Sequence, residues 1–329
     1  MSTLYTPCEI PEKEPKLDFS SFVVALGSCF STVMGGFLQQ RKFETLINPF
    51  GTLFNPISIL RNARMALQQE SYRPELVAQR DGLLAHYETH GDLMAYSEHA
   101  LMRLLAKRQS VCRHGLLEAS HVFLTFGTAW VHEHSPSGTL VANCHKQPAA
   151  FFTKRLLQVE EIVQAFEAFY LCLQEENPDA TFLLTVSPVR HTREGLPQNQ
   201  LSKSVLRLAC HEIEQRFPGV HYFPAYELML DELRDYRFYK EDLIHPSPLA
   251  EEMIWERFKA AWIHRSTFGL IHEFEQIQRE LAHRPINPEG VAHQRFVSSL
   301  LRKLERFDKD FDFSKEIEQL RKQAMQQSR

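Results

Sequence analysis

The sequence lacks the features that would direct it to a membrane or to nucleic acid by charge. Its 37 Lys and Arg residues are outnumbered by 41 Asp and Glu residues, which leaves a net charge of −4. No basic field therefore attracts nucleic acid or an anionic membrane. No stretch approaches the roughly 20 apolar residues of a membrane-spanning helix, and residues 1–20 do not show the basic-then-apolar pattern of a secretory signal. We expect a cytoplasmic protein with neither nucleic acid nor a membrane as its partner.

Paired cysteine spacing is also missing. The six cysteines are scattered along the chain, at Cys8, Cys29, Cys112, Cys144, Cys172 and Cys210. No disulfide framework is implied by this arrangement, and free thiols are usual in a reducing compartment. The cysteines therefore also indicate the cytoplasm.

Metal-ligand side chains occur in two short groups, but not at the spacing of a defined metal site. His132, Glu133 and His134 are consecutive, and Cys144 precedes His145. Imidazole and thiolate are ligands of transition metals, yet neither group matches a zinc pattern. We therefore expect neither a metal nor a cofactor.

The sequence does contain a regular alternation of short apolar runs and amphipathic stretches between residues 21 and 264. The apolar runs predict strands at 22–27, 46–50, 121–126, 180–186 and 220–223. Helical spacing predicts helices at 30–41, 56–69, 160–174, 203–217 and 248–263, the last one capped by Ser247. This alternation predicts an α/β fold, a three-layer sandwich in which helices cover both faces of a mostly parallel sheet.

Three further regions flank or interrupt this predicted domain. Residues 1–20 are polar, contain three prolines and are expected to form an arm over the surface. Residues 70–110 are interpreted as an inserted loop-and-helix region, whose His86 and His90 are not placed by the sequence. From 265 to 329, apolar residues recur at helical intervals and predict a helical C-terminal extension. Such an extension serves packing or the formation of a homo-oligomer.

The segment Gly27-Ser28-Cys29 is expected at the turn from the first strand into the first helix. In an open parallel sheet, ligands bind at the carboxyl ends of the strands, where this turn lies. A helix N-terminus is expected to lower the pKa of a cysteine thiol, so Cys29 is a candidate nucleophile. Two alternatives stay open: Cys29 is a small buried apolar residue, and Ser28 either caps the helix or is itself the nucleophile.

Asp242 and His245 form a second candidate pair, three residues apart and just before a predicted helix. A loop of this kind lets the carboxylate orient one ring nitrogen while the other faces a nucleophile. A turn with a surface histidine is the alternative. Arg190 and His191 follow a predicted strand and can face the same edge of the sheet, where Arg190 binds a carboxylate or phosphate or forms a surface ion pair.

Six segments carry a resemblance to a known family. They are, in order, 24–31 (VALGSCFS), 48–51 (NPFG), 126–130 (FGTAW), 142–146 (ANCHK), 187–191 (SPVRH) and 242–247 (DLIHPS). Over residues 20–262 the sequence is similar to the GSCFA family, within the SGNH/GDSL hydrolase superfamily. Two positions depart from the pattern: Ser31 replaces the alanine of the family motif, and Ala129 stands where the superfamily has an asparagine.

The resemblance implies a flavodoxin-like SGNH sheet and a site made of a nucleophile, a histidine and an aspartate. Cys29 takes the nucleophile position, with Ser28 as the alternative, and Asp242 and His245 match the DxxH pair. The candidate oxyanion and substrate-binding residues are Gly51, Gly127, Thr128, Asn143 and Arg190. Because Ala129 replaces an asparagine, one oxyanion donor is missing or comes from Thr128, Asn143 or a backbone N–H.

The implied function is acyl hydrolysis or acyl transfer on an ester, such as an O-acylated glycan or small molecule, through a covalent acyl-enzyme intermediate. A cysteine nucleophile would form a thioester, which is suited to transfer. The alternative is a non-catalytic ligand-binding module on the same fold, and Ala129 is the residue that supports it. A third, weaker hypothesis gives the C-terminal helices a role in assembly.

Overall fold

The computed structural model describes residues 6–283, 290–307 and 309–326. The parts of the predicted arm and C-terminal extension at 1–5, 284–289, 308 and 327–329 lie outside the described residues. No helix in the described ranges is both long enough and apolar enough to cross a bilayer.

A five-stranded parallel sheet forms the centre of the molecule, with the strand order β11-β10-β6-β1-β2. Its strands are β1 (Phe22–Gly27), β2 (Glu44–Ile47), β6 (His121–Phe126), β10 (Thr181–Val186) and β11 (Val220–Tyr222). The chain moves outward from β1 to β2 on one side and from β6 to β11 on the other. The direction of strand order therefore reverses between β1 and β6, and in open α/β sheets the ligand crevice lies outside the carboxyl ends of the strands at this point.

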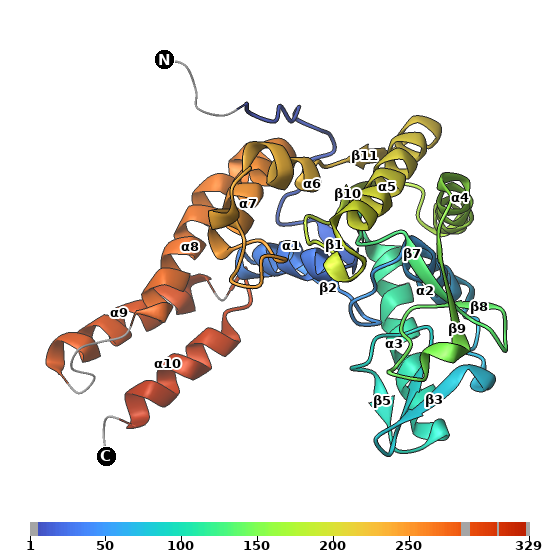
Figure 1. Cartoon of the computed structure of the whole chain (residues 1–329). Coiled ribbons are helices and arrows are strands. Elements are labelled where there is room, and N and C mark those ends of the chain that lie inside the picture. The colour runs from blue at the N-terminus through green and yellow to red at the C-terminus, as the bar shows by residue number, and fades with distance from the viewer. Residues whose placement is uncertain (1–5, 284–289, 308, 327–329) are drawn as a thin grey trace.

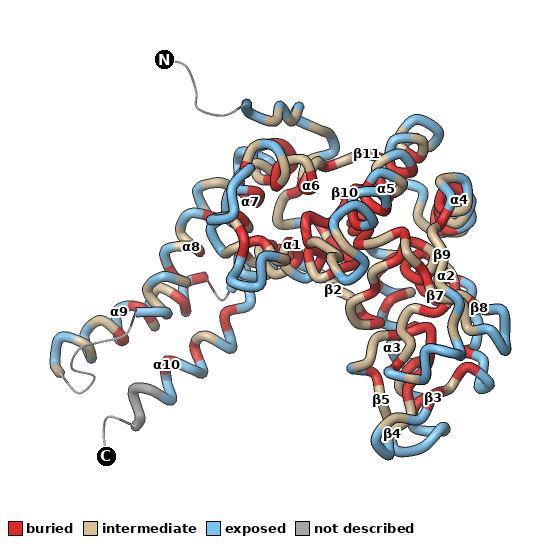
Figure 2. Tube along the Cα trace, in the orientation of Figure 1, coloured by how far each residue is buried: buried red, intermediate tan, exposed pale blue. Residues whose placement is uncertain are grey.

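The three inner strands β1, β6 and β10 are buried on both faces, which explains why they are mostly apolar runs rather than alternating ones. In β1, Val24 and Leu26 belong to one apolar core, while Val23 and Ala25 belong to the other. Figure 2 shows the buried residues concentrated on these strands and on the inner sides of the helices that cover them.

Helices cover each face, so the mixed α/β architecture with a parallel sheet is confirmed (Figure 1). One face packs against α1 (Cys29–Gln40), α6 (Ala225–Glu227) and α7 (Pro248–Trp262). The other packs against α2 (Pro56–Gln68), α3 (Glu98–Glu118), α4 (Val159–Glu176) and α5 (Leu196–Arg216). The side chain of Ser247 accepts a hydrogen bond from the backbone N–H of Ala250, so the predicted cap of α7 is confirmed.

Two small antiparallel sheets were missed by the sequence analysis. One consists of β3 (Val77–Arg80), β4 (Leu83–His86) and β5 (Met94–Ala95), and the other of β7 (Trp130–His134), β8 (Thr139–Val141) and β9 (Phe152–Leu156). The interpretation of residues 70–110 as loop and helix is therefore wrong in part, because β3–β5 lie there. The helical part, α3, is no surface addition, since its Leu105 and Cys112 are fully buried in the main core.

The N-terminal arm packs against the domain and is hydrogen-bonded to it near Leu17. Leu17 is fully buried, and its backbone N–H donates to the carbonyl of Trp262 at 2.8 Å. Leu17 also forms a parallel bridge with Ile263, directly after α7. The arm therefore extends the packing on the α7 side of the sheet.

The C-terminal extension is helical, as predicted. It contains α8 (Phe268–Ala282), α9 (Val291–Phe307) and α10 (Ser314–Gln326). The three helices enclose a small apolar core of their own around Phe274 and Leu304, and they project away from the sheet in Figure 1. Ion pairs from Arg41 to Glu275 and from Lys42 to Glu316 connect them to the end of α1. Their proposed role in forming a homo-oligomer stays a prediction.

Candidate active site

The turn that follows β1 has a backbone that only glycine fits at its first position. Gly27 adopts a φ of +137°, and a Cβ there would lie 2.2 Å from the carbonyl oxygen of Thr125. The N–H of Gly27 donates to Asn48 Oδ1 at 2.8 Å, and the N–H of Ser28 donates to the Thr125 carbonyl at 3.1 Å. Cys29 is then the first residue of α1. The predicted strand-to-helix turn is confirmed, and it lies beside the crossover between β1 and β6.

Cys29 is half-buried, and its thiol does not have the predicted pKa. Burial raises the pKa of Cys29, and this effect outweighs the opposing influences of its own backbone N–H and the positive charge of Lys240. The expectation of a lowered pKa for Cys29 is therefore wrong, because the helix N-terminus does not compensate for desolvation of the sulfur. A nucleophilic Cys29 would need a base to remove its proton.

Ser28 occupies the N-cap position of α1, but its side chain makes no capping hydrogen bond. The residue is almost fully buried, and within the described part of the chain its Oγ has no hydrogen-bond partner. The capping alternative for Ser28 is therefore wrong.

Asp242 and His245 form the pair that the sequence predicted. His245 Nδ1 lies 2.7 Å from Asp242 Oδ2, and Asp242 Oδ1 accepts hydrogen bonds from the backbone N–H groups of Ile244 and His245 at 2.9 and 3.0 Å. These bonds, led by those from the backbone, lower the pKa of Asp242 to about 2. Asp242 is therefore a carboxylate at neutral pH and orients the imidazole of His245.

The loop that carries this pair is bonded to the loop that follows β10. The backbone N–H of Arg190 donates to Ile244 O at 3.2 Å, and its guanidinium donates to Leu243 O at 3.4 Å and lies 3.9 Å from the centre of the Tyr239 ring. These contacts engage the guanidinium that the sequence analysis assigned to substrate binding. Arg190 positions the Asp242–His245 loop in this structure.

His191 joins the two loops and the turn at Ser28. A Cβ built on Gly127 would lie 3.3 Å from His191 Nε2 and 3.2 Å from Ser28 Cβ, so both residues border Gly127. Burial, followed by the positive charges of Lys203 and His245, lowers the pKa of His191 to about 3. His191 is therefore a neutral imidazole, close enough to His245 to be influenced by its charge. His191 thus borders Gly127 together with Ser28, and it comes from the loop that is bonded to the Asp242–His245 loop.

Lys203 is a site residue that the sequence analysis missed. It is fully buried on α5, and its Nζ donates to the carbonyls of Gly127 and Ser187, each at 2.7 Å. Burial lowers the pKa of Lys203 to about 7. The side chain ties together the carboxyl ends of β6 and β10. A lysine in an amphipathic helix is typical of a surface position, so its type and spacing contained no signal of this role.

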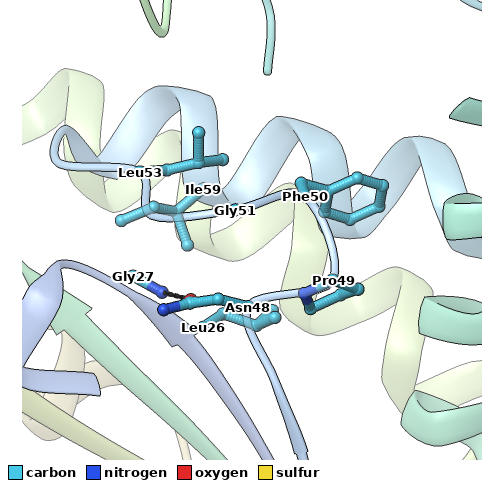
Figure 3. Close-up of a pocket in the computed structure, with 8 residues that line it drawn as sticks. All are labelled: Leu26, Gly27, Asn48, Pro49, Phe50, Gly51, Leu53 and Ile59. Atoms are coloured by element: carbon cyan, nitrogen blue, oxygen red, sulfur yellow. Dashed lines mark hydrogen bonds between the residues drawn. The ribbon is translucent and has the colours of Figure 1, made fainter. Parts of the chain in front are cut away.

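The segment after β2 contains the predicted oxyanion glycine (Figure 3). Strand β2 ends at Ile47 instead of continuing to Phe50, because Asn48 adopts a left-handed φ of +43° and turns the chain toward Gly27. The N–H of Gly51 donates to the Asn48 carbonyl at 2.8 Å, and His90 packs against Gly51. The small pocket drawn in Figure 3 is lined by Leu26, Gly27, Asn48, Pro49, Phe50, Gly51, Leu53 and Ile59.

The polar groups of residues 127–129, which the sequence analysis considered as oxyanion donors, are also engaged in hydrogen bonds. The N–H groups of Gly127 and Thr128 both donate to the Phe54 carbonyl, at 2.8 and 3.0 Å. The hydroxyl of Thr128 lies 3.1 Å from Ser202 Oγ and accepts a hydrogen bond from the backbone N–H of Trp130. The backbone N–H of Ala129 donates to Ser202 Oγ at 2.7 Å.

Asn143 lies in a different neighbourhood, between the two small sheets. Its Oδ1 accepts a hydrogen bond from the N–H of His145 at 2.8 Å, and its own N–H donates to the Tyr87 carbonyl. Its amide nitrogen lies near Gly91, next to His90. Asn143 is therefore linked to the Gly51 side of the site rather than to His191.

The metal-ligand side chains noted in the sequence do not converge in the described structure. His134 packs against Tyr87 and Phe152, and His145 bonds through Nε2 to the His86 carbonyl at 2.8 Å. Within the described ranges, the group with metal-ligand geometry consists of Glu252, Glu256 and Glu275, and Arg41 pairs with two of these carboxylates.

The comparisons with known proteins identify the family of the chain. A search of curated proteins gives no match. The model of the GSCFA family matches residues 22–258, which covers the sheet, both helical layers and every site residue described above. The model of the C-terminal domain of GSCFA domain proteins matches residues 274–326. The chain therefore belongs to the GSCFA family.

Proposed function

We propose that this protein is an SGNH-like acyl hydrolase or acyltransferase that forms a thioester on Cys29, with His245 as the base and Asp242 as the group that orients it. The observation that carries the proposal is the 2.7 Å contact between Asp242 and His245, on a loop that is bonded to the loop of His191. His191 in turn borders Ser28, the neighbour of Cys29. These contacts support a site in which a base and its orienting carboxylate serve a nucleophile on the neighbouring turn, as acyl transfer requires.

The strand order supports the SGNH assignment. Numbered along the chain, the central strands β2-β1-β6-β10-β11 follow the order 2-1-3-4-5, which is typical of flavodoxin-like sheets. The turns that follow β1 and β6 flank the switch point of this order. Ser28 and Gly127 come directly after these two strands, and Cys29 follows Ser28.

The proposed reaction begins with a protonated thiol, since the pKa of Cys29 is raised. His245 removes the thiol proton while the sulfur bonds to the ester carbonyl carbon, and the carbonyl π electrons move to oxygen. Collapse of this oxyanion breaks the bond to the alkoxide, which takes the proton from His245 and leaves as an alcohol. Water or an acceptor hydroxyl then gives its proton to His245 while its oxygen attacks the thioester carbonyl. The C–S bond breaks, the acyl group leaves as an acid or a new ester, and the thiolate takes the proton back from His245. The substrate class is an acyl ester on a small molecule or a glycan.

A second candidate function is a ligand-binding module without catalysis. It is favoured by the raised pKa of Cys29, which reduces the thiolate fraction, and by Ala129 at the position of an oxyanion donor. Such a module would bind the ester but would not turn it over.

Turnover of p-nitrophenyl acetate by matched variants distinguishes these functions. We expect Cys29→Ala to abolish release of p-nitrophenol. Cys172→Ala is the control, since Cys172 is also half-buried with a raised thiol pKa but lies on α4. Loss of activity in Ser28→Ala with retention in Cys29→Ala would show that the nucleophile is misassigned. Absence of turnover by the wild-type protein would favour the binding module.

A further inference from the structure

Two buried polar atoms without partners lie on either side of Gly127. Ser28 Oγ and His191 Nε2 are both buried, and neither has a hydrogen-bond partner among the described residues. Both residues approach the position of a Gly127 Cβ to within 3.3 Å. The φ of Gly127 is outside the left-handed region, so the backbone does not require glycine here. A side chain at Gly127 would meet both Ser28 and His191, so the glycine leaves the space between them open.

Leaving such groups unpaired is unfavourable. A buried donor or acceptor without a partner costs about 1–3 kcal/mol, and native proteins pair most of these groups with protein, water or ligand atoms. Two residues with unpaired groups border Gly127, and one of them precedes the half-buried Cys29, so we read this spot as a place for a polar atom of a ligand. Hydrogen bonds of this kind often form only when substrate is bound.

Three of the other candidate oxyanion donors are already engaged, and the side-chain amide of the fourth, Asn143, lies near Gly91 instead. The Gly51 N–H donates to Asn48, the Thr128 N–H donates to Phe54, and the backbone N–H of Ala129 donates to Ser202. Attack by a thiol on an ester creates negative charge on the carbonyl oxygen, and donors aimed at that oxygen supply much of the catalysis. The unpaired groups on Ser28 and His191 are chemically suited to this task.

We propose that the hydroxyl of Ser28 and the Nε2–H of His191 are the side-chain donors of the oxyanion site, taking the place of the asparagine that Ala129 replaces. This inference rests on the proposed acyl-transfer function. It makes Ser28 a donor rather than the nucleophile, and it gives the site two histidines with separate tasks.

The surroundings of His191 suit a donor and not a base. Its backbone N–H donates to Asn199 Oδ1 at 2.8 Å, and its ring meets the Phe54 ring edge-on at 5.6 Å, so the imidazole is held in place. With its pKa lowered to about 3, His191 resists protonation and cannot accept the thiol proton efficiently. A neutral imidazole with its proton on Nε2 can still donate a hydrogen bond.

The test compares His191→Ala, His191→Gln and Ser28→Ala in steady-state kinetics with p-nitrophenyl acetate. Loss of one oxyanion donor lowers kcat by roughly a hundredfold to a thousandfold, so we expect this loss in His191→Ala with little change in KM. His191→Gln should recover most of it, because the glutamine amide also donates. Ser28→Ala should lower kcat but still form the acyl-enzyme. His221→Gln is the control, since the pKa of His221 is also lowered by burial but its ring lies against Trp262.

A trifluoromethyl ketone provides a second readout, because the electrophilic carbonyl of its unhydrated form is attacked by a thiol to give a stable tetrahedral adduct. The inhibition constant of the ketone should rise in His191→Ala in parallel with the loss of kcat/KM. Circular dichroism checks that each variant is folded. If His191→Ala and Ser28→Ala are both as active as the wild-type protein, the oxyanion assignment is overturned while the proposed function stands. Absence of turnover and of ketone binding in the wild-type protein would overturn the proposed function and this inference with it.

Discussion

Asp242 holds His245 at two points: its Oδ2 faces the ring Nδ1 at 2.7 Å, and its Oδ1 accepts the backbone N–H at 3.0 Å. The ring and the main chain of His245 are therefore fixed by one carboxylate. The pair is partly exposed, so its value lies in orientation rather than in stability. This relationship leads directly to the first prediction.

Asp242→Asn should lower kcat by between about a hundredfold and ten thousandfold, because an amide favours the wrong tautomer of the imidazole. The asparagine carbonyl can still accept the backbone N–H groups, so the loop should keep its shape. The measurement is kcat/KM on p-nitrophenyl acetate. Glu241→Gln, a change at the exposed neighbouring residue, serves as the control and should have no effect. Equal activities of Asp242→Asn and Glu241→Gln would show that Asp242 takes no part in the reaction.

Arg190→Lys should lower kcat/KM by roughly tenfold to a hundredfold, because a small misplacement of His245 is enough for such a loss. Lysine keeps the positive charge but loses the hydrogen-bonding geometry and the stacking on Tyr239. Limited proteolysis should show faster cleavage near residues 240–245. Arg193→Lys is the matched control on the same loop. If the Arg190→Lys variant keeps an intact loop and loses only the binding of anionic esters, Arg190 binds substrate instead of positioning the loop.

Lys203 should make the stability of the protein depend on pH. Its pKa is about 7 in the folded chain and 10.5 for a free lysine, so between these values the unfolded chain binds a proton that the folded chain does not. Stability should therefore rise with pH from about 7, by up to about 1.4 kcal/mol for each pH unit. Urea unfolding at pH 7.0 and 8.5 measures this, and Lys203→Met should lack the Lys203 contribution to the slope. If stability rises with pH equally in the wild-type protein and in Lys203→Met, the pKa of Lys203 is not lowered by burial.

The glycine pair in α1 should respond in opposite directions to alanine. A Cβ on Gly35 would lie 2.7 Å from the side chain of Ile47, whereas nothing lies within 4 Å of a Cβ on Gly36. Gly35→Ala should therefore destabilise the protein by about 1–3 kcal/mol through overpacking, while Gly36→Ala should stabilise it by roughly 0.5–1 kcal/mol. Thermal unfolding compares the two, and each variant is the control for the other.

The sequence predicted those elements in which hydrophobic pattern and local signals agree. Strand β6 begins and ends at the predicted residues, and Ser247 caps α7 as expected. The inner strands β1, β6 and β10 are buried on both faces and so are mostly apolar runs. Helix α5 begins at Leu196, whereas the sequence predicted its start at Lys203. The prediction missed the first turns because they are polar and largely exposed and show no apolar periodicity.

Other features depend on contacts between distant segments. The strands β7–β9 contain histidine, glutamate and lysine at half-buried positions, so their alternation of apolar and polar residues is weak. The pKa of Cys29 depends on how deeply the turn is buried, which no local motif records. The pairing of Asp242 with His245 followed from their spacing, whereas the approach of His191 to Ser28 arises only when β1, β6 and β10 are assembled.

Peptide mapping of the trapped intermediate tests the central claim most directly. The protein is mixed briefly with p-nitrophenyl acetate, quenched in acid, digested and analysed by mass spectrometry. The account predicts an acetyl group on the sulfur of Cys29 that neutral hydroxylamine removes, as expected of a thioester, and that is absent in Cys29→Ala. An acetyl group on Ser28, or continued release of p-nitrophenol by Cys29→Ala, would contradict it.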